Sequence, residues 1–195
     1  MKFLVIGRTG TGKDTLREEL ERTYYGWKFV KSYTTRKKRY LSEDTHKFIS
    51  KEDSWKYRDK VAVTYIDNGT GYDEYFATRS DVLDSDAYIV DPVGMYQILC
   101  NMPEEHFAIV YLCTGKTIEK SIRCLVRNRK TPLHYAKRVI SEAAEFKVFE
   151  GLIKQDLLHS FRNVVRVKVV ENTYRPSCMK EAASSLNFMK RVNPL

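Results

Sequence analysis

A glycine-rich segment directly after a short apolar run constrains the fold of this chain more than any other feature. The apolar run is Phe-Leu-Val-Ile at 3–6, and the next segment is Gly-Arg-Thr-Gly-Thr-Gly-Lys-Asp-Thr at 7–15. Apolar residues at 16, 20 and 24 then have helical spacing, which predicts the order strand, loop and helix. In that order, backbone N–H groups and the helix N-terminus can bind one anion. We therefore predict a phosphate-binding loop with Lys13 reaching the outer phosphates, rather than a glycine-rich turn with a surface lysine.

Asp14 stands where such loops usually carry the Ser or Thr that binds Mg²⁺. A carboxylate about 4 Å from a phosphate oxygen costs on the order of 4 kcal/mol at an effective dielectric constant of 20. Asp14 should therefore either bind the metal or point away from the phosphates. We favour a metal role, with Mg²⁺ bound directly or through a water molecule.

The composition is that of an ordinary soluble protein, since 43% of the 195 residues are hydrophobic and 30% are charged. This length favours one domain over 1–195, and no apolar run is long enough to cross a membrane. Because the first residues already form the predicted core strand, we expect no signal peptide and a cytoplasmic location. The cysteines at 100, 113, 124 and 178 lack metal or redox spacing, and we expect buried free thiols.

The rest of the chain alternates β-prone runs with helical patterns. Strands are expected at 27–32, 87–90, 107–112 and 164–170, and helices at 116–130, from 132 to about 157 and from 176 to about 189. Residues 40–80 indicate an insertion of short strands, with a tight turn at 67–69. The helix after 132 has an apolar stripe, made of Tyr135, Val139, Ala143, Phe146, Phe149, Ile153 and Leu157. The pattern predicts an α/β fold, a doubly wound parallel sheet whose ligands bind beyond the carboxyl ends of its strands.

Three further segments carry the marks of one family. Residues 32–39, Ser-Tyr-Thr-Thr-Arg-Lys-Lys-Arg, form the densest basic run, and residues 91–94, Asp-Pro-Val-Gly, follow a predicted strand. Arg123 and Arg127 share a helical face, and Arg138 lies eleven residues further on. Together with the loop, and in the same order, they resemble the S-x-T-T-R-x-x-R segment, the D-x-x-G element and the lid arginines of guanylate kinases. The resemblance covers residues 3 to about 172.

This resemblance implies phosphoryl transfer from ATP and Mg²⁺ to a nucleoside monophosphate, GMP or dGMP. It implies a P-loop sheet with a small mixed α/β acceptor-binding insertion at about 33–80 and a helical lid at about 123–138. Lys13, Arg123, Arg127 and Arg138 would be catalytic by stabilising charge, without a protein base. The residues implied to bind ATP are Gly7, Arg8, Thr9, Gly10, Thr11, Gly12, Lys13, Asp14, Thr15 and Asn172, with Asp14 also holding the metal. The residues implied to bind the acceptor are Ser32, Arg36, Arg39, His46, Tyr75, Thr78 and Asp91.

The chain departs from the family pattern at the acceptor. His46 and Phe76 stand where the family has two phosphate-binding tyrosines, with Tyr75 beside the second position. The family glutamate that reads guanine has no clear counterpart, and Asp67 or Thr64 is the nearest candidate. Asp91 matches a carboxylate near the base, although an Asp there would also cap the following helix well. Guanine specificity is therefore predicted less securely than kinase activity.

Other functions remain open at this stage. The Gly-Lys-Asp sequence of the loop also resembles some viral deoxynucleoside monophosphate kinases and ribose bisphosphate kinases, so the acceptor could be another nucleoside monophosphate or ribose 1,5-bisphosphate. A noncatalytic guanylate-kinase-like binding module is a further alternative, although its phosphate loop would tend to be degraded. The net charge of +9 indicates an anionic partner. Since phosphates account for the arginines of the motifs, we expect neither nucleic acid nor membrane as partner, and a monomer or homodimer.

Overall fold

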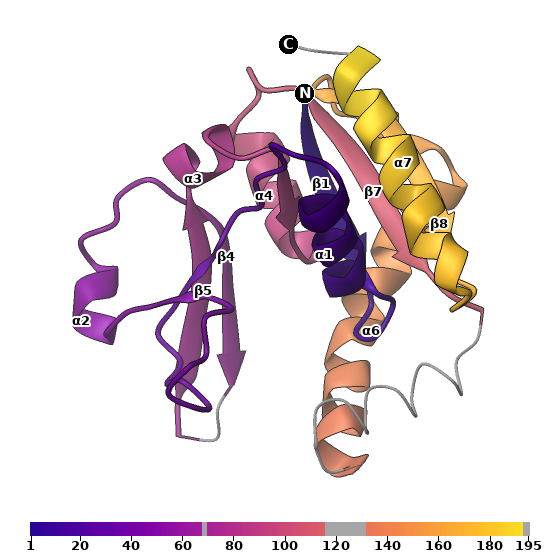
Figure 1. Ribbon diagram of the computed structural model, residues 1–195. Helices are drawn as coiled ribbons and strands as arrows, with labels where there is room; N and C mark the ends of the chain where they lie inside the picture. Colours follow the sequence, from indigo (N-terminus) through magenta and orange to yellow (C-terminus); the bar gives the residue numbers. More distant parts are fainter. Residues whose placement is uncertain (68–69, 116–131, 193–195) are drawn as a thin grey trace.

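A four-stranded parallel sheet forms the centre of the computed structural model, which describes residues 1–67, 70–115 and 132–192 (Figure 1). Its strand order is β6-β1-β7-β8, so that β1 pairs with β6 on one side and β7 on the other. This order confirms the doubly wound parallel sheet expected from the sequence. The bounds of its strands are β1 Lys2–Gly7, β6 Ala87–Ile89, β7 Phe107–Cys113 and β8 Val164–Glu171.

Helices cover both faces of this sheet, because successive residues of β1 point to opposite sides. Leu4 and Ile6 pack in one apolar cluster with residues of α4 and α6, whereas Phe3 and Val5 pack in a second cluster with residues of α1 and α7. Continuous apolar runs are typical of strands that are buried on both faces. The helices are α1 Lys13–Thr23, α4 Pro92–Asn101, α6 Pro132–Lys154 and α7 Pro176–Val192, and a short 3-10 helix, η1 Leu157–Ser160, follows α6.

A second, smaller sheet lies to one side of the core (Figure 1). Its strand order is β3-β2-β5-β4, and its main unit is the antiparallel pair β4 and β5. This mixed sheet falls within the insertion expected at about 33–80, while the turn predicted at 67–69 lies mostly outside the described residues. The elements are β2 Tyr33–Thr34, β3 Lys47–Phe48, α2 Lys51–Ser54, β4 Lys60–Asp67, β5 Tyr72–Thr78 and α3 Arg79–Leu83.

A bulge in β4 fastens the second sheet to the core. The pairing of β4 with β5 shifts between Val61 and Thr64, and Ala62 has a positive φ of 53°. The side-chain amide of Gln97, on α4, accepts a bond from the Val63 N–H at 2.6 Å and donates one to the Val63 carbonyl at 3.1 Å. The backbone groups freed by the bulge are therefore satisfied by the core.

Two expectations about secondary structure were wrong in part. Residues 27–32 form no strand, because only an isolated bridge joins Phe29 to Ala87 at the edge of β6. Among the described side chains of the stripe expected for α6, Phe146 and Phe149 are buried, whereas Val139 is 37% exposed and Leu157, in η1, is 43% exposed. Figure 1 shows the first part of α6 extending past the carboxyl edge of the sheet.

The cysteines are less buried than expected. Cys113 and Cys178 are half-buried and Cys100 is exposed, and all three are free thiols. Cys124 lies outside the described residues. In the part of the chain that the structure describes, no helix combines the length and the apolar character that crossing a membrane requires.

The tight contact between α4 and the β4 bulge can be tested with two glycines. A Cβ added at Gly94 would lie 2.5 Å from Val90 Cγ2 and 3.1 Å from Ala62 Cβ, whereas at Gly151, in α6, it would meet nothing within 4 Å. We expect Gly94→Ala to lower the free energy of unfolding by about 1–2 kcal/mol, since overpacking outweighs the gain in helix propensity. Gly151→Ala should raise it by up to about 1 kcal/mol. Urea denaturation measures both, and equal effects would contradict the packing described here.

Candidate functional site

The glycine-rich segment forms a tight loop between β1 and α1, as the sequence predicted. Gly10 and Gly12 have positive φ values of 83° and 97°, a conformation that favours glycine. The Thr11 N–H and hydroxyl both donate to the Arg8 carbonyl, at 3.2 and 2.9 Å. At Gly7, a Cβ would lie 2.5 Å from Thr11 Oγ1. The glycines are therefore needed for the close approach of the loop to itself.

Lys13 lies back across this loop at the start of α1. Its ammonium donates to the carbonyls of Gly7 and Arg8, the latter at 3.0 Å. Asp14 and Thr15 follow in the first turn of α1 and are exposed. An exposed carboxylate at a helix N-terminus next to a phosphate-binding loop is a reasonable ligand for Mg²⁺ when phosphate oxygens complete the coordination.

Asn172 holds the loop through a side-chain hydrogen bond to its backbone. Its side chain is 4% exposed, and its amide donates to the Thr11 carbonyl at 2.9 Å. A Cβ at Gly12 would lie only 2.7 Å from the same amide nitrogen. The Tyr174 hydroxyl adds a bond to the Gly10 carbonyl at 2.9 Å. The contact of Asn172 with an adenine ring stays a prediction, whereas its role in holding the loop follows from these bonds.

Helix α6 binds the other side of the loop through carboxylates. The Thr9 N–H donates to Glu142 Oε2 at 3.0 Å, and the Thr9 hydroxyl donates to the same carboxylate. The Arg8 guanidinium pairs with Glu150 through two bonds of 3.0 and 3.1 Å and lies 5.0 Å from the centre of the Phe146 ring. Thr9 and Arg8 are therefore occupied by α6 in this structure.

The carboxylates near the carboxyl edge of the sheet also influence one another. Burial, followed by the charges of Asp91 and Glu142, raises the pKa of Glu145 above its ordinary value. Anionic groups thus face the loop from α6 and from the end of β6, so the site is not uniformly basic.

A second cluster gathers around Arg36 in the insertion. The Arg36 guanidinium donates to Glu43 at 2.9 and 3.2 Å and to the Tyr75 hydroxyl at 3.0 Å. Glu43 is 1% exposed, and it also accepts the Arg39 N–H at 2.7 Å. The bonds from Arg36 hold the pKa of Glu43 at about 2, against an ordinary 4.5. Arg36 is thus fixed in place, whereas the Arg39 side chain is 54% exposed.

His46 completes this cluster beside Tyr75. The edge of one ring meets the face of the other at a centroid distance of 5.6 Å. Burial, followed by the charge of Arg36, lowers the pKa of His46 to about 4. At neutral pH the imidazole is therefore uncharged, and it can offer an anion one N–H donor but no positive charge.

The β4 bulge brings Thr64 to Asp91, which connects the cluster to the core. The Thr64 hydroxyl donates to Asp91 Oδ2 at 2.9 Å, and Thr64 pairs with Tyr75 across the strands. Asp91 also caps α4, because its Oδ1 accepts the Gly94 N–H at 2.6 Å. The capping role that the sequence allowed is confirmed. Asp91, Thr64, Tyr75 and Arg36 therefore form one continuous series of contacts.

Other predicted acceptor residues point elsewhere. Thr78 is buried and caps α3 through a reciprocal pair of hydrogen bonds with Asp81. Ser32 bonds to the Tyr88 hydroxyl at 3.0 Å. Phe76 is fully buried against Tyr33, at a ring distance of 5.0 Å, so Tyr75 rather than Phe76 bonds to Arg36. Base and acceptor contacts of Thr78 and Ser32 stay predictions, without support from these bonds.

The predicted lid falls largely outside the described residues. Arg123 and Arg127 both lie there, and for Arg138 the structure describes only the backbone, which is helical within α6. Their catalytic roles therefore stay predictions. The sequence reasoning did not identify Glu43, Glu142 and Glu150, although the spacing of Glu142, Phe146 and Glu150 by four residues was a signal of one helix face.

Comparison with solved structures shows which known fold this is. The chain matches the crystal structure of guanylate kinase from Anaplasma phagocytophilum with a TM-score of 0.55 and 15% sequence identity. The match covers 98% of this chain and 85% of that chain. No protein-family model matches the sequence, and no curated protein matches it. The chain therefore has a guanylate kinase-like fold.

The buried pair of Arg36 and Glu43 should make stability depend on pH. Because the pKa of Glu43 is lowered on folding, its contribution is complete above about pH 4.5 and is lost as the pH falls toward 2. We expect Glu43→Gln to be less stable than the wild type by about 3 kcal/mol at pH 7, since Arg36 loses its partner. That gap should shrink between about pH 4.5 and 2.

Urea denaturation at several pH values measures this gap. The exposed Glu18, on α1, provides a matched control, and Glu18→Gln should differ from the wild type by no more than about 0.5 kcal/mol at any pH. A gap for Glu43→Gln that stays constant down to low pH would contradict the ion pair.

Proposed function

We propose that this chain, whose fold is guanylate kinase-like, is a nucleoside monophosphate kinase that transfers the γ-phosphoryl group of ATP to GMP or dGMP. One observation carries the proposal. The glycine-rich loop follows β1, and the series of contacts from Asp91 to Arg36 begins at the end of the neighbouring strand β6. The proposed donor and acceptor sites therefore lie at the same edge of the sheet, where such sheets bind their ligands.

The donor half of the proposal rests on the loop. Its tight turn and the N-terminus of α1 suit a polyphosphate, and Lys13 is close enough to exchange its bonds to loop carbonyls for bonds to phosphate oxygens. Mg²⁺ would be held by Asp14 together with those oxygens and would neutralise the charge that develops during transfer. Among the described residues, no group of three or more acidic, His or Cys side chains could hold a metal ion.

The acceptor phosphate fits the Arg36 cluster. Glu43, Tyr75 and the Lys37 carbonyl take four of the five N–H groups of Arg36, which leaves one Nη2–H for a phosphate oxygen. The Nε–H becomes a second donor if a phosphate oxygen replaces the Tyr75 hydroxyl. Arg39 is exposed enough to turn toward the same anion, and Tyr75 replaces the missing phosphate-binding tyrosine at the position of Phe76. His46 adds one neutral donor.

The base would be read by Asp91 and Thr64. Because the Thr64 hydroxyl donates its hydrogen bond to Asp91, the two side chains together present only acceptor lone pairs to a ligand. Guanine offers two adjacent donors, its ring N–H and its exocyclic amino group, and so complements such a surface. In this proposal Thr64 takes the place of the absent family glutamate.

The chemical step needs little from the protein beyond positioning and positive charge. The acceptor phosphate is already an anion at neutral pH, so no side chain has to remove a proton from it. Arg123, Arg127 and Arg138 are proposed to stabilise the transferring group, and a lid that carries them would exclude water from the donor.

The first test measures ADP release from ATP and Mg²⁺ with each of GMP, dGMP, AMP, dTMP, CMP, UMP and ribose 1,5-bisphosphate. We expect turnover with GMP and dGMP, and a loss of at least about 100-fold in Lys13→Ala, because the transferred charge loses its nearest cation. Turnover with another acceptor alone would keep the kinase and remove the guanine assignment. No turnover with any acceptor would favour a noncatalytic binding module.

A second test concerns the carboxylate on the loop. Glu142 should oppose ATP binding, because its carboxylate accepts the Thr9 N–H and repels the phosphates that would bind at the loop. We expect Glu142→Gln to bind ATP at least about fivefold more tightly, since the amide oxygen still accepts from Thr9 but carries no charge. Isothermal titration calorimetry without acceptor measures this affinity. Glu104→Gln, before the amino end of β7, should leave it unchanged, and weaker binding in Glu142→Gln would overturn the argument.

A further inference from the structure

Two adjoining hollows lie beside α2 on the second sheet. Figure 1 shows α2 on the side of that sheet that is turned away from the parallel sheet. Each has a volume of about 520 Å³, and Thr35 and Lys51 line both. We call them together the outer groove. In the β4–β5 pairing, Tyr65 and Glu74 lie on the face that lines the second hollow, whereas Thr64 and Tyr75 lie on the opposite face. Arg36 belongs to the acceptor cluster and also lines the first hollow.

Exposed aromatic rings line one end of the outer groove. Trp55 is 79% exposed, Tyr65 is 64% exposed and Tyr72 is 61% exposed. Trp55 directly follows α2, and the two tyrosines come from β4 and β5, which are neighbours in the sheet. Three large rings gathered in one hollow leave much apolar surface in water, which is typical of a surface that binds a partner.

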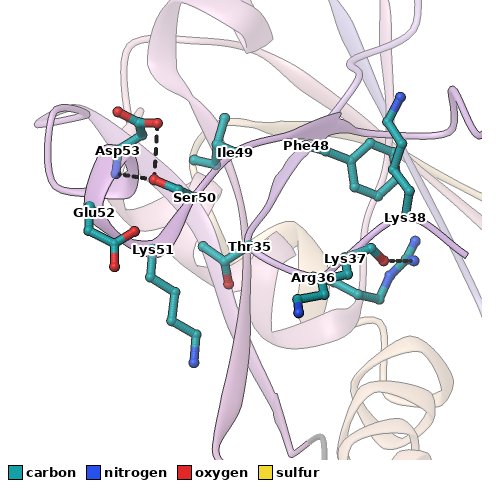
Figure 2. Close-up of a pocket in the computed structure, with 10 residues that line it drawn as sticks. All are labelled: Thr35, Arg36, Lys37, Lys38, Phe48, Ile49, Ser50, Lys51, Glu52 and Asp53. Carbon is teal, nitrogen blue, oxygen red and sulfur yellow. Dashed lines mark hydrogen bonds between the residues drawn. The ribbon is translucent and has the colours of Figure 1, made fainter. Parts of the chain in front are cut away.

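Cations line the groove along its length. Arg36, Lys37, Lys38, Lys51, Arg58 and Lys60 outnumber the carboxylates Glu52, Asp53 and Glu74. Two of these carboxylates are already paired, Glu74 with Lys60 at 2.7 Å and Asp53 with Lys56 at 2.5 Å. Figure 2 shows Lys37 and Lys51 extending on either side of Thr35, in the first hollow. Neither Lys51 nor Arg58 forms a salt bridge with a carboxylate among the residues that the structure describes.

We propose that the outer groove binds single-stranded nucleic acid. Aromatic faces stack on bases of any sequence, and lysines and arginines beside them follow the phosphates, which is the combination found in the groove. Two joined hollows with cations at both ends suit a strand of several nucleotides better than one mononucleotide. Rings on an exposed sheet face also suit a flexible single strand better than a stiff duplex.

This proposal revises the expectation of no nucleic acid partner. The sequence placed Arg36 and Arg39 on a small-molecule phosphate, and the structure leaves that assignment in place. It adds Lys51, Arg58 and the three rings, which are scattered between residues 51 and 72 and share a surface only after α2 folds over the hairpin. The proposal does not depend on kinase activity, since Lys51, Arg58 and the three rings are no part of the acceptor cluster.

Tryptophan fluorescence gives a direct test. The chain has two tryptophans, and Trp27 is only 6% exposed, so a base that stacks in the groove should quench mainly Trp55. We expect an oligothymidylate of about 15 nucleotides to quench this emission, and a fluorescent copy of it to gain anisotropy, both declining steeply between about 50 and 200 mM salt. Saturating ATP with Mg²⁺ should not reverse either signal, because the phosphate loop is no part of the groove.

Paired variants locate the binding. Lys51→Glu with Arg58→Glu should weaken oligonucleotide binding at least about tenfold and flatten its salt dependence, and Trp55→Ala with Tyr72→Ala should also weaken it at least about tenfold. The matched controls are Lys28→Glu with Lys180→Glu, and Tyr25→Ala, all at exposed positions away from the groove. Circular dichroism verifies that each variant folds.

Four results would overturn the proposal. One is that the oligonucleotide fails to bind at low salt, and another is that the groove and control variants lose binding equally. Full displacement by ATP would place the strand on the phosphate loop, and equal quenching by a mononucleotide would contradict a site for a strand. A kinase that fails to bind the oligonucleotide and a binder that lacks kinase activity are distinct outcomes, so each proposal can fail alone.

Discussion

The two hydrogen bonds between Gln97 and Val63 decide where the acceptor cluster lies. They hold the β4 bulge against α4, and the bulge in turn presents Thr64 to Asp91 at the end of β6. Without the extra residue of a bulge, the side chains of one strand segment would fall on the opposite face of the sheet. The position of Tyr75, and through it of Arg36, depends on the same register. A single amide side chain thus links the insertion to α4.

A carboxylate of the protein contacts each of the two proposed phosphate sites. Glu43 bonds to Arg36 at the acceptor site, and Glu142 bonds to Thr9 at the phosphate loop. Glu43 is buried and strongly ionised, so it orients Arg36 permanently. Glu142 is only half-buried and holds a backbone N–H of the loop, so an incoming polyphosphate competes with it. The first arrangement lowers the entropy cost of ordering Arg36 when an anion binds, and the second restricts the conformations of the loop.

The sequence predicted those parts of the fold that depend on neighbours along the chain. The phosphate loop, the strand that precedes Asp91 and the cap that Asp91 supplies each follow from a few consecutive residues. The burial pattern of α6 and the bonds of Asn172 could not be predicted in this way, because they depend on which distant element lies opposite. The strand expected at 27–32 was wrong for the same reason: an apolar run forms a strand only where a sheet edge continues beside it, and β6 supplies a single bridge.

Helix α6 touches the loop at Glu142, Phe146 and Glu150, on successive turns of one face, and begins 18 residues before Glu150 at Pro132. At 1.5 Å per residue, the roughly ten residues from Pro132 to Glu142 form an arm of about 15 Å beyond the last of these contacts. A tilt of about 10° at Glu142 would move the start of α6 by about 3 Å. Arg138 lies on this arm, so its backbone would move with the loop.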